Sequence, residues 1–535
     1  MMNLNDIDTT DPSKFRLIGT SVLSYRFAVP HDREIFVGDI LKIMDTAKKM
    51  TFFAKVTDLI HDSNFSDTKW DTRPRTEQFY GLGEDVYLRV EAVPLGYIDS
   101  RGVFRKPRTL PSKFSRIEYP DAEDFGFLQQ VMGDIEVGVM KSGQDILGGV
   151  HVSLHARVLP QHMGVFATTG MGKSNFMKVF CASCMKARQF GLLMVDPHGE
   201  YVRGGTSSTG DPTKGLLHYT TGKAKGMSVF STRREAERRT YSLNSLWLEY
   251  DDFQASDLFL LFEHSAPQAE VVESLEDMRG SEVIAFFSGT DFDNFTPEMY
   301  RGPYPHIARV IADYHPGTLK VIKRRIDILT RNNRFFRARG SSVPDIMRAL
   351  HENRVVLVDI PGMGERSELF VLSIITRMIL KDHKEKTGGW GTGNAEENRQ
   401  VLITIEEAQR VLGSGGRGAQ VFREIAMEGR KFGVGLCVVT QQPKNIDARV
   451  LAQLNTFVVM GLGDRSDRAM IAGSAKQDLS GMDTEIQTLE QGDAIISTLG
   501  IPFPVSTRIH LFEEYLSVLN RDTGTNIRDG LPSRF

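Results

Sequence analysis

The sequence predicts an α/β protein in which a parallel sheet covered by helices follows a small all-β domain. Residues 15–140 contain short β-rich runs, such as "REIFVGDILKIMD", with turn residues between them, a pattern typical of a small barrel or sandwich. From about residue 163, continuous apolar strands alternate with helices, which indicates a parallel sheet buried on both faces. The interval 202–350 interrupts those strands with mostly helical segments.

These changes of pattern predict the domain limits. An N-terminal β-barrel is expected over 1–145, the sheet domain over 146–201 and 351–515, a helical insertion over 202–350 and a C-terminal tail over 516–535. The expected sheet strands share an apolar, β-branched character and lie at 163–167, 191–196, 354–360, 401–406, 434–440 and 455–462.

The composition limits which classes of protein this sequence can belong to. The 535 residues are 41% hydrophobic and 25% charged, as in an ordinary globular protein, and the net charge of −3 means that any nucleic-acid surface must be local. An odd, sparse set of three cysteines, Cys181, Cys184 and Cys437, predicts a reducing cytoplasm, and no second Cys/His pair completes a zinc site with "CASC". The chain has no apolar run of ~18 residues, so we expect no membrane span.

The segment "ATTGMGKS" joins a predicted strand to a predicted helix and has the spacing of a phosphate-binding loop. Gly170 and Gly172 allow the backbone N–H groups to turn inward onto an anion, Lys173 would reach the β- and γ-phosphates, and Ser174 would offer its hydroxyl to Mg²⁺. The usual first glycine is Ala167, but that position supplies no ligand group. ATP is therefore expected to contact Thr169, Gly170, Met171, Gly172, Lys173, Ser174 and Asn175.

Paired acids follow another predicted strand in "VLITIEEAQ". Glu406 would hold Mg²⁺, directly or through water, and Glu407 would polarise the attacking water as a general base. The alternative is a pair of exposed acids at a strand end.

Two further strand ends are candidates for the same site. "VDPHGEY" places Asp196 where it could orient water or metal with help from Glu200, or it is a plain turn; a zinc site with His198 lacks further ligands. "VVTQQP" would put Thr440 and Gln441 beside the γ-phosphate, unless it is only a polar strand end.

Arginines follow the paired acids. Arg430 is the first candidate, and Arg423 the second, to project into a neighbouring subunit's site and stabilise phosphoryl charge. An arginine is also favoured at a helix C-terminus for its own sake. Arg417, in a Gly-rich loop, is a candidate for contact with DNA phosphate.

Taken in order, "ATTGMGKSN", "VDPHGEY", "TIEEAQ", "AMEGRKFGVGL", "TQQP" and "LEQGDAIISTLGIPFPV" resemble the HerA family, of the HerA/FtsK group of P-loop ATPases. The resemblance covers roughly 15–515, is weak in 202–350, and extends to the barrel that precedes the motor in HerA. It implies a RecA-like core, ATP held between the subunits of a homo-hexameric ring, and translocation of double-stranded DNA.

The resemblance also implies an effector docked on the barrel side, such as a NurA-like nuclease in DNA-end processing or a sirtuin-like protein in anti-phage defence. By match of motif, Lys173, Ser174, Glu406 and Glu407 take nucleotide, metal and water, Asp196 and Gln441 belong to the active site, and Arg430 resembles the trans-acting arginine. The family often has Gly at 167, Asp at 406 and Arg at 442; here these are Ala, Glu and Gln.

Two alternatives stay open at this point. One is a conjugation or secretion ATPase of the same superfamily, a class that commonly carries or joins membrane parts. The other is a ring that acts mainly as a scaffold to assemble and activate an effector.

Overall fold

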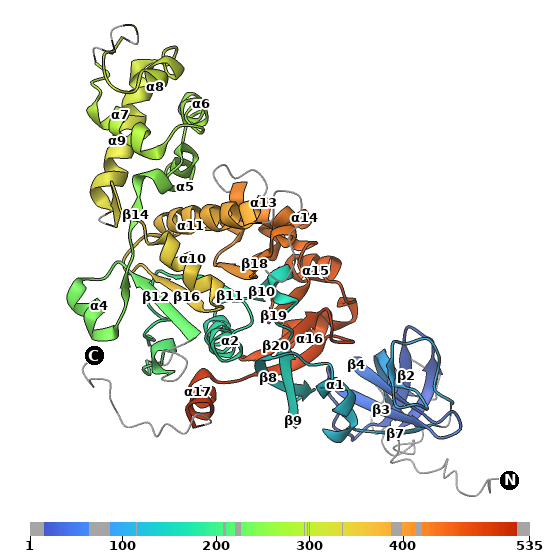
Figure 1. Ribbon diagram of the computed structural model, residues 1–535. Coiled ribbons are helices and arrows are strands. Elements are labelled where there is room, and N and C mark those ends of the chain that lie inside the picture. Colours follow the sequence, from blue (N-terminus) through green and yellow to red (C-terminus); the bar gives the residue numbers. More distant parts are fainter. Residues whose placement is uncertain are drawn as a thin grey trace, which may run out of the picture. The chain divides into compact units, whose positions relative to one another are not determined.

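The computed structural model describes residues 15–521 except 64–85, 114, 207–209, 220–225, 294, 297, 299, 334, 387–398 and 414–419. The chain forms two compact units, each made of two stretches of sequence. The first unit runs to Leu154 and resumes at Phe457–Ile509, and the second contains His155–Thr456 and the residues from His510 onward (Figure 1).

The first unit contains an antiparallel half-barrel in the strand order β1-β2-β5-β4-β3-β7, with β6 paired to β5. Alternate side chains of β2 face the core of the half-barrel, so that Tyr25, Phe27 and Val29 are buried while their neighbours are not. The strands are β1 (Arg16–Thr20), β2 (Tyr25–Pro30), β3 (Ile40–Asp45), β4 (Met50–Ser63), β5 (Val86–Ile98), β6 (Phe104–Arg105) and β7 (Arg116–Glu118). The predicted all-β domain is therefore present.

The rest of the first unit is a second antiparallel group in the order β20-β21-β8-β9, with β19 beside β20. These strands are β8 (Ile135–Ser142), β9 (Asp145–Leu154), β19 (Thr456–Met460), β20 (Asp493–Thr498) and β21 (Val505–Ile509). Within the interval predicted as the barrel, β8 pairs with the distant β21. The hairpin expected around Gly500 is formed by β20 and β21.

Among its described residues, the second unit contains a sheet portion of seven parallel strands in the order β13-β12-β16-β11-β17-β18-β10. They are β10 (Met163–Ala167), β11 (Gly191–Asp196), β12 (Met227–Ser231), β13 (Asn244–Ser245), β16 (Val355–Asp359), β17 (Val401–Ile405) and β18 (Val434–Thr440). Parallel strands bring their carboxyl ends, and the polar residues that follow them, to one edge.

Helices lie on both faces of these strands: α11 (Glu365–Lys386) and α13 (Gln420–Glu428) on one, α2 (Lys173–Ala187) and α17 (Phe512–Arg521) on the other (Figure 1). The helix α17 begins before the predicted tail and packs on α2, so part of that tail belongs to the folded core. Within the described part of the chain, no helix combines the length and the apolar character needed to cross a bilayer.

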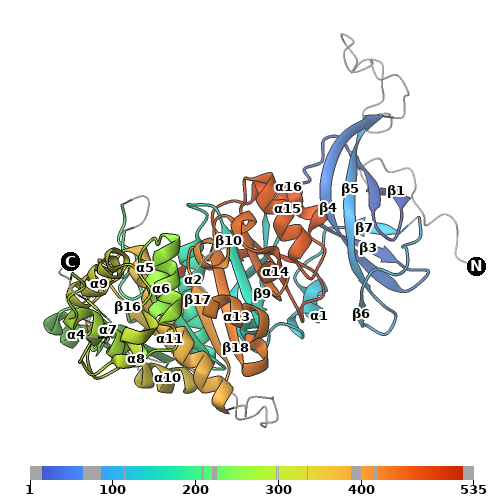
Figure 2. The same ribbon diagram turned by 90° about the horizontal axis from the view of Figure 1, so that it is seen from above.

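The interval 202–350, predicted as a mostly helical insertion, contains strands as well as helices. The strands β12 and β13 lie inside 202–350, and β12 pairs with β16, so the sheet takes two strands from the interval expected to interrupt it. The five residues of β12, "MSVFS", carry too short an apolar run to stand out in the sequence. The helices there are α4 (Glu235–Tyr241), α5 (Leu258–Leu261), α6 (Ala266–Ser274), α7 (Gly280–Gly289), α8 (Pro305–Val310), α9 (Pro316–Asn332) and α10 (Val343–His351), and most of them gather beyond α11 (Figure 2).

Candidate nucleotide site

The loop between β10 and α2 has the backbone of a phosphate-binding loop. Gly170 and Gly172 have φ angles of +87° and +97°, which only glycine adopts without strain, and Lys173 begins α2. Ala167 is the last residue of β10 and is fully buried in the strand. The missing first glycine is therefore no defect, because the chain has not yet left the strand at that position.

Glu407 lies at the centre of the polar cluster beside this loop. Its Oε1 atom is 3.4 Å from the Lys173 Nζ atom and accepts a hydrogen bond of 3.0 Å from the Gln441 amide, and Oε2 accepts one of 2.8 Å from the Gln409 amide. Burial raises the pKa of Glu407, but the hydrogen bond from Gln409 and the charge of Lys173 outweigh it, so the net pKa lies below its usual value. The carboxylate is therefore ionised and able to accept a proton.

The backbone at Glu407 is unusual. Its φ of +46° lies in the left-handed region, which a residue with a side chain enters at a cost of about 1–3 kcal/mol. Such conformations cluster at functional sites. Here the turn directs Glu406 toward Tyr201 and Glu407 toward Lys173 and Gln441.

Glu406 is held by Tyr201, whose hydroxyl donates a hydrogen bond to the Glu406 Oε1 atom. The same hydroxyl interacts with the Ser174 side chain, so Tyr201 links the two residues predicted to hold Mg²⁺. Burial raises the pKa of Glu406, although Tyr201 and the charge of Lys173 lower it. A carboxylate and a hydroxyl oxygen placed together are ligands that suit Mg²⁺.

Gln441 connects the phosphate loop to the candidate base. Its Oε1 atom accepts a hydrogen bond of 2.6 Å from the Thr169 hydroxyl, while its amide donates to Glu407. The pairing of β10 with β18 places Phe166 opposite Thr440, which brings the two strand ends together. Any movement of the loop at Thr169 therefore reaches Glu407 through a single side chain.

Asp196 holds the segment that carries Tyr201. Its carboxylate accepts backbone hydrogen bonds of 2.8 Å from Gly199, 3.0 Å from Tyr201 and 2.9 Å from Val202, and it is 1% exposed. Burial raises its pKa to about 6, against those hydrogen bonds. These contacts make Asp196 a positioning residue for Tyr201, which differs from the predicted direct role with water or metal.

The side chain of Asn175, predicted to contact nucleotide, is engaged elsewhere. Its amide donates to the His510 carbonyl at 2.8 Å and its oxygen accepts from the Phe512 backbone N–H at 2.9 Å. Asn175 thereby ties α2 to the start of α17. Its backbone N–H, next to that of Ser174, is the part of the residue that remains suited to a phosphate.

A cavity of about 350 Å³ adjoins Glu406, Glu407 and Gln441. His198 and Arg410 also line it, so the structure adds a basic residue, Arg410, that the sequence did not single out. Tyr201 and Gln409 were missed as well, although both lie inside motifs that the sequence made conspicuous, "VDPHGEY" and "TIEEAQ".

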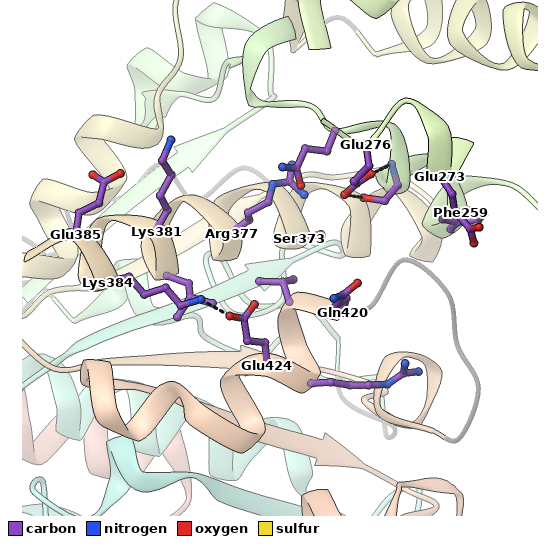
Figure 3. A pocket seen from close by; sticks show the side chains of 15 residues that line it. Phe259, Glu273, Glu276, Ser373, Arg377, Lys381, Lys384, Glu385, Gln420 and Glu424 are labelled. Atoms are coloured by element: carbon purple, nitrogen blue, oxygen red, sulfur yellow. Dashed lines mark hydrogen bonds and ion pairs between the residues drawn. The ribbon is translucent and has the colours of Figure 1, made fainter. Parts of the chain in front are cut away.

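A second cavity, of about 790 Å³, lies between α11, α13 and the helical insertion (Figure 3). Two of its charged side chains form ion pairs, Lys384 with Glu424 and Arg377 with Asp257. It contains no phosphate loop, and Arg423, the second-choice arginine, lines it. The smaller cavity is the one next to the phosphate loop, because Glu407 and Gln441 in its lining contact Lys173 and Thr169 of that loop.

Arg430 lies away from the phosphate loop of its own chain. Arg430 precedes β18 in a short 3-10 turn and donates to the Gln453 side chain at 3.0 Å, whereas Gln441 follows the other end of β18. The seven residues of β18 rise about 3.3 Å each, so roughly 20 Å separates the two ends. The Arg423 guanidinium donates to the Gly413 carbonyl at 3.3 Å, and Arg417 lies outside the described residues.

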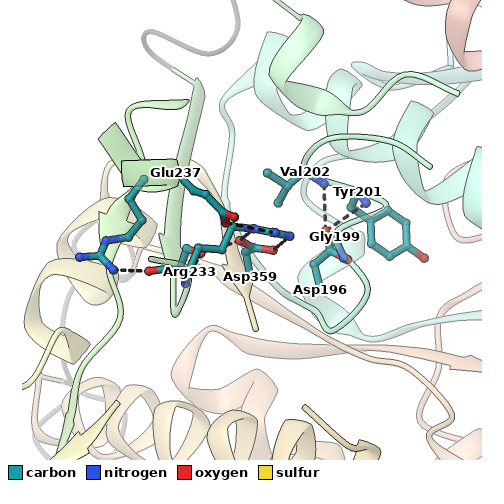
Figure 4. A network of polar contacts seen from close by, with 9 residues as sticks. Asp196, Gly199, Tyr201, Val202, Arg233, Glu237 and Asp359 are labelled. Carbon is teal, nitrogen blue, oxygen red and sulfur yellow. Dashed lines mark hydrogen bonds and ion pairs between the residues drawn. The ribbon is translucent and has the colours of Figure 1, made fainter. Parts of the chain in front are cut away.

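A buried ion pair stabilises the edge of the sheet next to Asp196. Arg233 donates to Asp359 at 2.7 Å and 3.1 Å, and Ser231 donates to the same carboxylate at 2.6 Å (Figure 4). Asp359 ends β16 directly opposite Asp196 on β11. The side chains of Arg233 and Asp359 are 7% and 0% exposed.

Replacing Arg233 with Ala is expected to lower the free energy of unfolding by about 3–5 kcal/mol, because Asp359 would stay buried without its counter-charge. Urea unfolding of the full chain measures the change. Arg239→Ala is the matched control: Arg239 pairs with Glu235 on the exposed face of α4, and its loss should cost less than about 1 kcal/mol. Equal effects of the two substitutions would contradict the prediction.

Comparison with known proteins fits this geometry. Residues 135–379 match the model of the "Helicase HerA, central domain" family. The DNA double-strand break repair helicase HerA of Pyrococcus furiosus is 23% identical over 84% of this chain and 82% of its own length. The chain is similar to HerA helicases over most of its length. The HerA protein of Sulfolobus acidocaldarius is 21% identical over 85% of this chain and 84% of its own.

Among solved structures, the plasmid coupling protein TrwB bound to a non-hydrolysable ATP analogue aligns with 73% of this chain and 92% of its own, at 12% identity and a TM-score of 0.47. The similarity to HerA helicases agrees with the motifs that carry Lys173, Glu407 and Gln441. It also agrees with an α/β fold that combines a parallel sheet and an N-terminal half-barrel.

Proposed function

We propose that this HerA-like protein is an ATP-dependent translocase of double-stranded DNA that works as a ring with a partner effector. The observation that carries the proposal is the convergence of Lys173, Glu407 and Gln441 at one sheet edge. ATP would lie on the loop at Thr169–Asn175, and Mg²⁺ would be held by Ser174 and Glu406. That cation would neutralise phosphate charge.

Each side chain of the site then has its own role in ATP hydrolysis. Lys173 leaves Glu407 to pair with the β- and γ-phosphates, and Glu407 accepts the proton of the attacking water. Gln441 holds the base and contacts Thr169, so that it senses whether the γ-phosphate is present. Tyr201 and Asp196 position Glu406.

In a ring of subunits, Arg430 could contact the nucleotide bound to the neighbouring subunit. Because roughly 20 Å of strand separates it from the phosphate loop of its own subunit, Arg430 can act only on a neighbour's nucleotide. A closed ring of identical subunits, six in our proposal, supplies every site with one such arginine. DNA would pass through that ring and contact Arg417.

The half-barrel is the proposed docking side for the effector, a nuclease in DNA-end processing or another enzyme in anti-phage defence. Exposed apolar side chains near the β1–β2 turn support an interaction there: Leu23 is 83% exposed, Ile18 43% and Val22 40%. Apolar groups gathered on a surface often mark an interface. The proposal of a scaffold ring predicts instead that effector activity needs assembly but no hydrolysis.

Displacement of a third DNA strand tests the translocase proposal. The wild-type chain with Mg²⁺ and ATP is expected to strip a labelled triplex-forming strand from duplex DNA, and a non-hydrolysable ATP analogue is expected to leave it bound. Glu407→Gln should show no displacement. ATP hydrolysis without displacement on any duplex would contradict translocation and favour the scaffold.

A further inference from the structure

A cluster of metal-ligating side chains lies away from the nucleotide site, where α10 meets α11. His351 ends α10, and Asp382 and His383 lie in the last turn of α11. The His351 Nε2 atom is 3.3 Å from the His383 Nε2 atom and 3.6 Å from the Asp382 Oδ2 atom. One ligand atom from each residue lies within 4.8 Å of the other two.

The hydrogen bond between His383 and the Phe432 carbonyl determines the tautomer of the His383 ring, and so determines that the Nε2 lone pair faces the cluster. Its Nδ1 atom is 2.8 Å from the Phe432 carbonyl oxygen, which can only accept, so Nδ1 carries the hydrogen and Nε2 is the acceptor in the neutral ring. A backbone carbonyl in this place is the usual support for a metal-bound histidine. His383 is 2% exposed, so its orientation is set by packing.

The spacing matches a tetrahedral cation. Two nitrogens, each about 2.0–2.1 Å from Zn²⁺ at a tetrahedral angle, lie about 3.3–3.4 Å apart, close to the 3.3 Å found here. A direct hydrogen bond between the two rings is the competing interpretation, and 3.3 Å is long for one. The carboxylate of Asp382 already attracts a cation, the Lys386 ammonium at 2.7 Å.

We propose that His351, Asp382 and His383 form a binding site for one divalent transition-metal ion, zinc being the best fit. Two imidazoles favour such ions over Mg²⁺, which prefers oxygen ligands, so the site is chemically distinct from the one at Ser174 and Glu406. A bound ion joins α10 to α11. Through His383 and the Phe432 carbonyl it also fixes the turn that contains Arg430, a consequence that rests on the proposed function.

Zinc binding by the full chain tests this site. Protein freed of metal with a chelator and then dialysed is titrated with zinc chloride against a chromophoric zinc chelator, without nucleotide. We expect one tightly held zinc per chain. His351→Gln and Asp382→Asn should each weaken binding by at least about 10–100-fold, the range already seen when only an outer partner of a ligand is lost.

Three controls sharpen the result. His306→Gln removes a histidine that faces a single glutamate at 2.9 Å and should leave zinc binding unchanged. Lys386→Gln should tighten binding, because it removes the cation that competes for Asp382. Cobalt in place of zinc should give the visible absorption of a tetrahedral ion in the wild type and not in His351→Gln.

The proposal is overturned if the metal-free wild type binds no zinc in the titration, or if His351→Gln and Asp382→Asn bind zinc as tightly as the wild type does. Circular dichroism of the metal-free proteins shows whether each variant is folded, and Asp382, which is partly exposed, carries the test if the His351 variant is not. Since the assay contains no ATP or DNA, its failure would leave the proposed translocase untouched.

Discussion

Replacing Glu407 with Gln is expected to lower the rate of ATP hydrolysis by about 10²–10⁴-fold while ATP still binds. An amide has the size of the carboxylate but cannot accept the proton of the attacking water. Glu407 is ionised, because its pKa lies below its usual value, and the amides of Gln409 and Gln441 and the ammonium of Lys173 hold its carboxylate in place.

Phosphate release gives the hydrolysis rate, and a fluorescent ATP analogue gives the affinity. Glu428→Gln makes the same chemical change on an exposed glutamate that pairs only loosely with Lys431, at 3.6 Å, and should hydrolyse ATP at the wild-type rate. Hydrolysis by Glu407→Gln within about threefold of wild type would remove Glu407 from the role of general base. Loss of ATP binding in that variant would instead indicate a structural role.

Replacing Arg430 with Ala is expected to lower hydrolysis by at least about 10³-fold, the contribution of an arginine that stabilises phosphoryl charge from a neighbouring subunit. The substitution should leave the folded subunit intact, because the Arg430 side chain is exposed and donates a hydrogen bond of 3.0 Å to the Gln453 side chain. Arg239→Ala, which removes a similarly exposed arginine of α4, should have no effect on hydrolysis. Mass measurement of both variants checks that any ring still assembles.

The sequence predicted the parts of the site that follow from strand order alone. Ala167, Glu406 and Gln441 were recognised because each lies at the carboxyl end of an apolar strand, and parallel strands bring those ends to one edge. The half-barrel was predictable from short β-rich runs between turn residues, and in β2 the alternating burial follows alternating hydrophobicity.

The parts that the sequence could not predict depend on contacts between distant positions. Tyr201 and Glu406 are 205 positions apart in the sequence, and Arg233 and Asp359 are 126 positions apart. The sequence around each residue therefore does not indicate its partner. The same holds for β8, whose partner β21 lies at the far end of the chain, and for the short strand β12. In each case tertiary pairing, not local pattern, decides the place of the residue.

Mixing the Glu407→Gln and Arg430→Ala chains tests most directly whether one ATP site is built from two subunits. In a mixed ring, an Arg430→Ala subunit still contributes Lys173 and an intact Glu407, and a neighbouring Glu407→Gln subunit still contributes Arg430. We therefore predict that unfolding, mixing and reassembly of the two inactive chains restores a measurable fraction of the wild-type phosphate release. Phosphate release equal to the sum of the two separate variants, from rings shown by mass to contain both chains, would contradict a site shared between subunits.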